Sequence, residues 1–374
     1  MSGARQMPRA RMGARALALL LLLLPGRAVA GDLQGGGRLQ SSYAHDSNVF
    51  EVTDPGRRQS DGSLRLQGEV RLVAAELPLE SRAELLLRGL AESFQDHPAE
   101  DRRQGEAGLS WDLAPAAARH RVTLETGYGL RAYPDSSSRG HHRAWGRLIG
   151  VAPVGPRGSL VGRLDIWQLD FRRTPTIDQT GGGFDLSYEH PVGRGLVLRG
   201  GLDLGTVHHR SESLRHLVVG GDPPAEYGAD RRDSYRFLHV GCRKTGRLVV
   251  QAQAGFRMQA SNSLDGVLHR PEVNWLVSRS LGWRVIGQFY GNLEHTTYTA
   301  RALRHVSVTR TGEIEAGDDD NTIVLRVARP LGHRWDLDAR IGWYRNEALL
   351  LGVYYRKQVI SLGVSQNFGS ASSF

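Results

Sequence analysis

The sequence predicts an all-β protein, a transmembrane antiparallel up-and-down β-barrel of about 16 strands. Three observations favour this fold. Many segments alternate apolar and polar side chains, the connections between them are alternately short and long, and an export signal precedes them. Alternation with a period of two is typical of a strand with one apolar and one polar face, and a strand of about 9–11 residues is long enough to cross a bilayer.

The first residues have the features of an export signal. Four arginines precede an apolar run at 16–24, the run is broken at Pro25, and small residues at 28–30 form a cleavage site. The run is too short for a transmembrane helix, which needs about 20 apolar residues. We therefore expect a signal peptide at 1–30 and a single outer-membrane β-barrel domain at 31–374.

The charge balance does not indicate a nucleic-acid partner. The chain has 48 basic and 39 acidic residues, a formal charge of +9, but five of the basic residues lie in the signal peptide. The mature chain would carry 43 − 39 charges, or +4, which is modest for a nucleic-acid-binding domain. The single cysteine, Cys242, has no partner for an internal disulfide.

The alternation assigns the strands one by one. Leucine and valine alternate with arginine, glutamine and glutamate at 64–77, and the segments at 120–133 and 196–208 repeat this arrangement. The segment at 82–94 also fits an amphipathic helix. One later segment holds Pro271, and because proline cannot donate to a sheet ladder, we expect that strand to begin after it.

The count is 16, although 14 to 18 strands are compatible with the pattern. Even numbers are expected of bacterial single-chain barrels. The predicted strands are 38–50, 64–77, 82–94, 104–113, 120–133, 141–152, 159–172, 182–190, 196–208, 234–243, 248–260, 268–279, 283–296, 321–329, 334–346 and 355–368.

The connections sort into two kinds. The first, third and later odd-numbered ones are generally longer and polar, whereas the even-numbered ones are mostly short and contain proline or glycine. Outer-membrane barrels have short periplasmic turns and longer external loops. The long connections at 209–233 and 297–320 are therefore expected outside the cell.

The last strand, 355–368, is expected to close the wall against the first. Ile360, Leu362 and Val364 give it an apolar face, and small or polar residues alternate with them. The expected partners are outer-membrane lipid on the apolar face and the barrel-assembly machinery, through this C-terminal strand. By the same alternation the apolar face carries Trp111, Tyr128, Trp275, Phe289 and Trp343, and such rings are favoured near lipid headgroups.

The opposite face of the strands is highly charged. Its predicted lumen-lining residues are Arg65, Arg71, Arg121, Arg131, Arg163, Arg199, Arg257, Arg284, Arg326, Arg340, Asp165, Asp336 and Asp338. So many charges require water or ion-pair partners, and sixteen strands enclose a bore wide enough for water. The arginines would favour anionic solutes. The alternative is a lattice of paired arginines and acids that braces the wall or closes the bore.

Catalysis and metal binding are not expected. Histidine pairs occur at 141–142 and 208–209, but no spacing of serine, histidine and acid suggests a catalytic triad. No third metal ligand accompanies either pair, and the acidic stretch at 313–320 lacks the spacing of an EF-hand. We predict neither enzymatic activity nor a cofactor.

A short motif adds a family resemblance. Residues 42–50 read Ser-Tyr-Ala-His-Asp-Ser-Asn-Val-Phe, and a first strand ending in Tyr-x-x-Asp-Ser-Asn-Val resembles the outer-membrane β-barrel porins associated with exopolysaccharide export. The resemblance implies a stand-alone porin-like barrel, because the helical repeats of related exporters are not found here. It also implies that Asp46 and Asn48 lie at the outer rim. They would serve transport there, or tie the strand ends together by side-chain hydrogen bonds.

Three functional hypotheses follow, all for an integral protein of the cell outer membrane that is exported with a cleaved signal peptide. The first is a porin-like channel for passive passage of small or anionic solutes, including saccharides or polysaccharides. The second is a closed structural or adhesin-like barrel whose loops at 209–233 and 297–320 bind partners. An enzyme is the third.

Overall fold

The computed structural model describes residues 33–49, 55–77, 81–113, 120–135, 140–171, 178–212, 230–261, 267–298, 321–347 and 354–369. The predicted signal peptide at 1–30 and most of the predicted loops at 209–233 and 297–320 lie outside these residues.

Strands form almost all of the described chain, and they make one antiparallel sheet that closes on itself. The strands are β1 (Leu33–Asp46), β2 (Asp61–Leu77), β3 (Ser81–Phe94), β4 (Arg102–Asp112), β5 (Arg121–Ala132), β6 (His141–Val154), β7 (Gly158–Phe171), β8 (Gln179–Gly193), β9 (Leu196–Glu212), β10 (Asp230–Lys244), β11 (Leu248–Ser261), β12 (Val267–Gly282), β13 (Val285–Glu294), β14 (Thr297–Tyr298), β15 (Thr322–Leu331), β16 (Trp335–Glu347) and β17 (Tyr354–Gly369).

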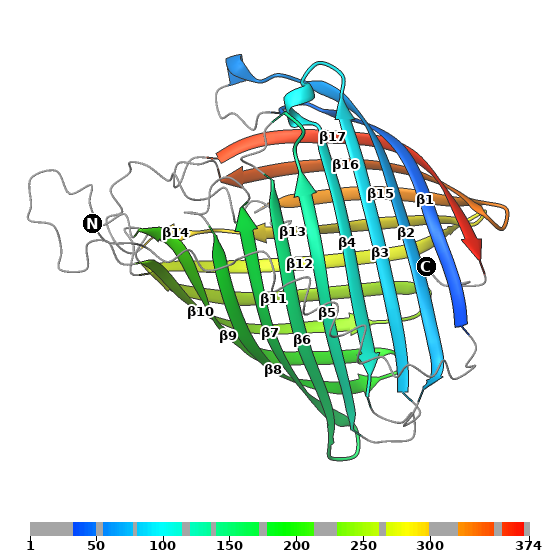
Figure 1. Ribbon diagram of the computed structural model, residues 1–374. Helices are drawn as coiled ribbons and strands as arrows, with labels where there is room; N and C mark the ends of the chain where they lie inside the picture. The colour runs from blue at the N-terminus through cyan, green and yellow to red at the C-terminus, as the bar shows by residue number, and fades with distance from the viewer. Residues whose placement is uncertain are drawn as a thin grey trace, which may run out of the picture.

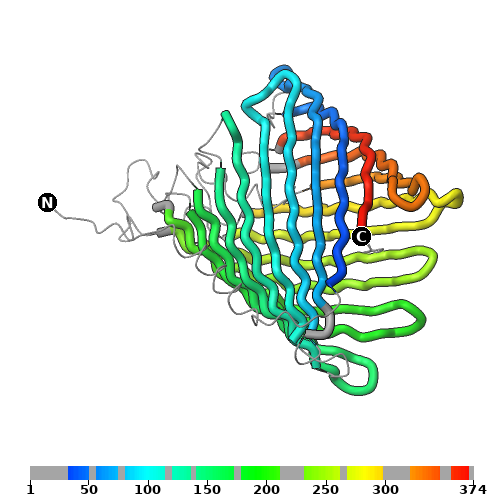
Figure 2. Tube along the Cα trace, turned by 45° about the vertical axis from the view of Figure 1, so that its right-hand side comes forward, coloured from blue at the N-terminus to red at the C-terminus, as the bar shows by residue number. Residues whose placement is uncertain are grey.

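Each strand pairs with its neighbours in the chain, and β1 pairs with β17 to close the barrel. In Figure 2 the last strand, in red, lies beside the first, in blue. Strands of the near and far walls cross in Figure 1, as expected when all strands tilt against the barrel axis. The predicted fold class, a transmembrane antiparallel up-and-down barrel, is confirmed.

Sixteen strands form the wall, as predicted, because β14 continues β13. Both segments pair with β12 in the same register, and the break between them lies opposite Pro271. His295 N donates to Pro271 O at 3.2 Å, but proline has no N–H to return the bond. The prediction that this strand begins after Pro271 is wrong, since β12 starts at Val267. The segment that also fitted a helix is β3.

The two ends of the barrel differ. At one end, which we call the short-turn end, β8–β9 and β12–β13 are joined by two residues each, 194–195 and 283–284. At the other, the long-loop end, the connections are generally longer, and those after β1 and β3 contain the 3-10 turns η1 (Pro55–Arg57) and η3 (Pro98–Glu100). This asymmetry is the predicted one.

The two faces of the wall also differ. Leu64, Ile166, Leu238 and Leu362 point outward and are 57–63% exposed, so lipid would cover them. The predicted aromatic residues lie on this outer face by strand alternation, with Phe289 43% and Trp343 45% exposed. Among the described residues, no helix is long and apolar enough to cross a membrane.

Two glycines on β9 allow neighbouring rings to lie flat against the inner wall. His239 of β10 covers Gly201, where an added Cβ would come within 2.8 Å of the imidazole. Tyr235 covers Gly205 in the same way, with a closest approach of 2.3 Å. Because no Cβ stands between strands β8 and β10 at these points, both side chains run along the wall instead of into the bore.

Candidate functional site

The candidate site is the charged inner face of the wall. Alternation along the strands places inward the predicted residues Arg65, Arg71, Arg121, Arg131, Arg163, Arg199, Arg257, Arg326, Arg340, Asp165, Asp336 and Asp338. Arg284 is a correction. It lies with Trp283 in the turn between β12 and β13, and both residues have positive φ (62° and 46°), as a two-residue type I′ hairpin turn requires.

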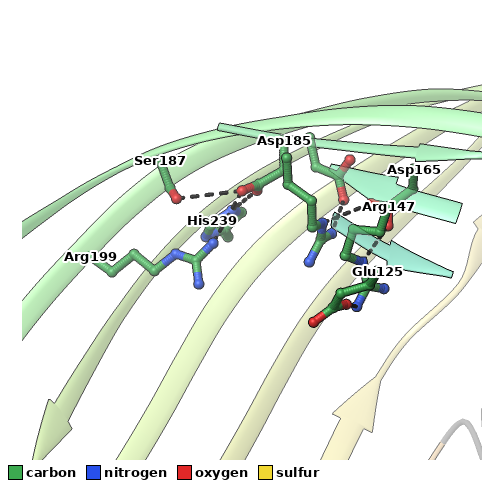
Figure 3. Close-up of polar contacts among 9 residues, drawn as sticks. Glu125, Arg147, Asp165, Asp185, Ser187, Arg199 and His239 are labelled. Atoms are coloured by element: carbon green, nitrogen blue, oxygen red, sulfur yellow. Dashed lines mark hydrogen bonds and ion pairs between the residues drawn. The ribbon is translucent and has the colours of Figure 1, made fainter. Parts of the chain in front are cut away.

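A chain of ion pairs crosses β5 to β9 (Figure 3). Arg147 Nη1 lies 3.1 Å from Glu125 Oε2, and Arg147 Nε lies 2.5 Å from Asp165 Oδ1. Arg163 Nε contacts the other oxygen of Asp165 at 2.7 Å, and Arg163 Nη2 lies 3.9 Å from Asp203 Oδ2 on β9. The two arginine side chains are 37% and 35% exposed, so the pairs are only partly buried on the inner face.

Asp185 on β8 is the centre of a second cluster (Figure 3). Its carboxylate accepts hydrogen bonds from Arg199 at 3.1 Å and from Ser187 at 3.4 Å, and His239 Nε2 lies 3.2 Å away. Asp185 is only 3% exposed. Both Ser187 and His239 contact the acid, whereas a nucleophile and its base must contact each other. The cluster is therefore not built as a catalytic triad.

A third cluster lies on β2–β4 near the long-loop end. Glu92, which is 5% exposed, lies 2.8 Å from Arg65 Nη2 and 2.6 Å from Arg102 Nε. Ser63 donates to the same carboxylate at 3.0 Å. One buried acid thus joins three strands.

The barrel seam carries its own polar contacts. Arg38 of β1 donates to the Ser365 hydroxyl on β17 at 2.8 Å, and Asn367 donates to Asp336 on β16 at 2.9 Å. Nearby, Arg326 pairs with Asp338 and donates to Gln288 at 3.1 Å.

Several inward arginines have neutral hydrogen-bond acceptors. Arg340 donates to the Tyr344 hydroxyl at 2.8 Å, and Arg131 donates to Gln104 at 3.4 Å. Arg257 lies over the rings of Tyr235 and Phe237, at 5.4 and 5.1 Å, with Glu272 at 3.7 Å. The remaining predicted arginines have acidic partners: Arg71 lies 3.1 Å from Glu84, and Arg121 lies 2.6 Å from Asp112.

The first-strand motif lies at the long-loop end. Asn48 N donates to Asp46 Oδ1 at 2.8 Å, and Asn48 Nδ2 donates to Arg356 O at 3.2 Å. Asn48 is fully buried, at 0% exposure. These contacts tie the end of β1 to β17.

The two histidine pairs lie on β6 and β9. His141 and His142 point to opposite faces of β6, and His209 contacts Asp233 at 3.1 Å. Among the residues that the structure describes, no three His, Cys, Asp or Glu side chains gather as metal ligands would.

Sequence reasoning missed several residues of these clusters, among them Arg38, Glu92, Arg102 and His239. Strand alternation alone assigns Glu92 and His239 to the inner face. Arg38 and Arg102 were harder to assign, because they lie at or beyond the ends of the predicted strands.

Comparison with known proteins adds fold likeness only. No protein-family model matches the sequence, and no curated protein matches it. Similar solved structures include a bacterial polysaccharide outer membrane secretin, with 11% identity over 90% of this chain and 98% of that one and a TM-score of 0.44. OccAB1 of Acinetobacter baumannii (8%, 90% and 97%, 0.45) and OprB of Pseudomonas putida (8%, 90% and 94%, 0.48) are also similar. These values are too low to carry a functional argument.

Proposed function

We propose that the protein is an integral outer-membrane channel through which small polar solutes pass passively, with a preference for anions. The observation that supports this proposal is that the contacts between inner side chains run along the wall. Arg163–Asp203 and Asp185–His239 each reach over one intervening strand and follow the wall. Contacts of this kind brace the wall without crossing the bore, and a sixteen-strand barrel is wide enough for an aqueous channel.

The preference for anions rests on arginines with neutral acceptors. Arg340 bonds a tyrosine hydroxyl and Arg38 a serine hydroxyl, and within the described part of the chain neither bonds a carboxylate. Such charges attract anions along a lumen.

A saccharide solute is the finer form of the proposal. Trp145 and Trp167 lie directly opposite each other on the inner face of β6 and β7, one register step from Arg147 and Asp165. Aromatic rings offer an apolar surface to the carbon face of a sugar, and paired Arg and Asp groups offer donors and acceptors to its hydroxyls.

The test is single-channel recording of the refolded barrel in a planar bilayer. We expect stepwise currents and, in a salt gradient, a reversal potential of the sign for anion preference. Addition of neutral or acidic oligosaccharides would then reduce the current if sugars enter the lumen. Absence of current from protein that is folded by heat-modifiable gel shift would refute the channel and favour the closed, adhesin-like barrel.

A further inference from the structure

The outer face of the wall has an uneven distribution of arginines. Six outward-facing arginines are exposed on strands near the long-loop end: Arg103, Arg210, Arg232, Arg236, Arg345 and Arg356. Asp170 is the acidic residue on this face at this end, counted among the strand residues whose side chains the structure describes. Arg210 has a carboxylate partner, Asp178, at 3.6 Å.

One pair within this set faces across neighbouring strands, and a histidine lies opposite a further member. Arg345 of β16 is directly opposite Arg356 of β17, and Arg232 of β10 is directly opposite His208 of β9. Directly opposite side chains lie about 4.5–5.5 Å apart at Cβ, so the guanidinium groups of Arg345 and Arg356 can contact the same anion. Guanidinium binds phosphate and carboxylate by paired hydrogen bonds.

Along the wall below Arg345 and Arg356, the polarity of the side chains changes in the same order as the parts of a lipid molecule. One register step deeper, Trp343 lies opposite Gln358, and the next step pairs Ile341 with Ile360. Trp343 is 45% and Ile360 51% exposed. From the rim inward, the surface thus changes from cationic to amphipathic to aliphatic over about 13 Å. A headgroup, its linkage region and its acyl chains change in the same order.

The short-turn end lacks this arrangement among its described residues. On the strands, its outward lysine and arginine side chains are Lys244, Arg279 and Arg329, and their cross-strand neighbours are uncharged: Leu196 and Val250, Leu248 and Gly287, and Leu337. Single cations of this kind suit general contact with a membrane surface. Paired cations suit a headgroup with more than one negative charge.

We propose that Arg345 and Arg356, with the strip below them on β16 and β17, bind an anionic lipid headgroup that carries phosphate, as a phosphorylated glycolipid of the outer leaflet does. The inference rests on the proposed membrane location, but not on an open lumen. It places the long-loop end in the external leaflet, with a lipid bound at the barrel seam.

The test measures lipid binding to the full folded chain in detergent by native mass spectrometry, with diphosphorylated lipid A as the probe. The variant is Arg345→Gln with Arg356→Gln, and the matched control is Arg279→Gln with Arg329→Gln. Each arginine near an anionic surface contributes about a fivefold factor, so the variant should bind roughly thirtyfold more weakly. The control should bind as the unchanged protein does.

Further arms identify the ligand. Inorganic phosphate at millimolar concentration should not displace lipid A, and neutral phosphatidylethanolamine should not compete. Displacement by phosphate alone would mean an ion site instead of a lipid site. Equal loss in both double variants, or none in either, would overturn the proposal. If the double variant does not fold, Arg345→Lys with Arg356→Lys should fold and retain most of the binding. Conductance is recorded separately, so a sealed lumen would refute the channel and leave this result standing.

Discussion

His239 Nε2 lies 3.2 Å from Asp185 Oδ2, although the two residues belong to strands β10 and β8, which are not paired with each other in the sheet. Gly201 on the strand between them makes the contact possible, because it places no side chain under the imidazole. This relationship combines the two properties that we assign to the inner wall. The side chains are bonded to one another, and they lie along the surface of the bore.

Replacing Gly201 with alanine should push the imidazole into the lumen. The added Cβ would come within 2.8 Å of His239 and 2.7 Å of Ser187, an overpacking that typically costs about 1–3 kcal/mol. We expect a lower unfolding temperature by gel shift and a smaller single-channel conductance. Gly150→Ala is the control, since nothing lies within 4 Å of its Cβ position. Equal conductance in both variants would contradict the flat arrangement.

Arg340→Gln should weaken the preference for anions. At about 7 Å in water, a unit charge changes the energy of a passing ion by about 0.6 kcal/mol, so the permeability ratio should change roughly two- to threefold. The double variant Arg326→Gln with Asp338→Asn removes a bonded pair and leaves the net charge unchanged. Its reversal potential should therefore stay close to that of the unchanged protein. A larger shift in the paired variant would show that bonded charges set selectivity.

Glu92→Gln should destabilise the barrel strongly. Loss of the carboxylate leaves Arg65 and Arg102 beside an uncharged group that is 5% exposed, and breaking a buried pair in this way costs about 3–5 kcal/mol. Arg121→Gln breaks the pair with Asp112, but its side chain is 64% exposed, so we expect a change of about 1 kcal/mol or less. Urea unfolding of both variants in lipid vesicles measures the difference. Similar losses would mean that burial of Glu92 is unimportant.

Pro271→Val should stabilise the wall. The new N–H would face β13, where His295 N already donates to the carbonyl of residue 271, and one further hydrogen bond contributes about 0.5–1.5 kcal/mol. Hydrogen exchange at Thr297 should slow as β13 and β14 become continuous. The opposite change, Val273→Pro, removes an N–H on the same side of β12 and should cost about 3 kcal/mol or more. No gain from the valine would point to another cause of the break.

Alternation along the chain predicted most of the wall. The predicted strand 248–260 is one residue shorter than β11 (Leu248–Ser261), and 355–368 is one residue shorter at each end than β17 (Tyr354–Gly369). A strand with lipid on one side and water on the other alternates apolar and polar residues. This period of two can be recognised in the sequence. The start of β1 at Leu33 was missed because Gly35, Gly36 and Gly37 have no side chains to alternate.

The contacts within the site were less predictable. Alternation assigned Arg163 and Asp203 to one face, but not to each other, because their contact depends on the register of β7, β8 and β9 together. The role of Gly201 was hidden for the same reason. Arg284 was misplaced because the turn was predicted at 280–282, where Gly282 indicates one, whereas the structure forms it at 283–284.

The seam sets the order in which the barrel can be completed. β1 pairs with β17 from Gly36–Gly369 to Asp46–Val359, so the first strand of the sheet pairs with the last. A partly assembled sheet would present unpaired N–H and C=O groups at both edges, which are templates for aggregation. Formation of the seam therefore removes both exposed edges in one step.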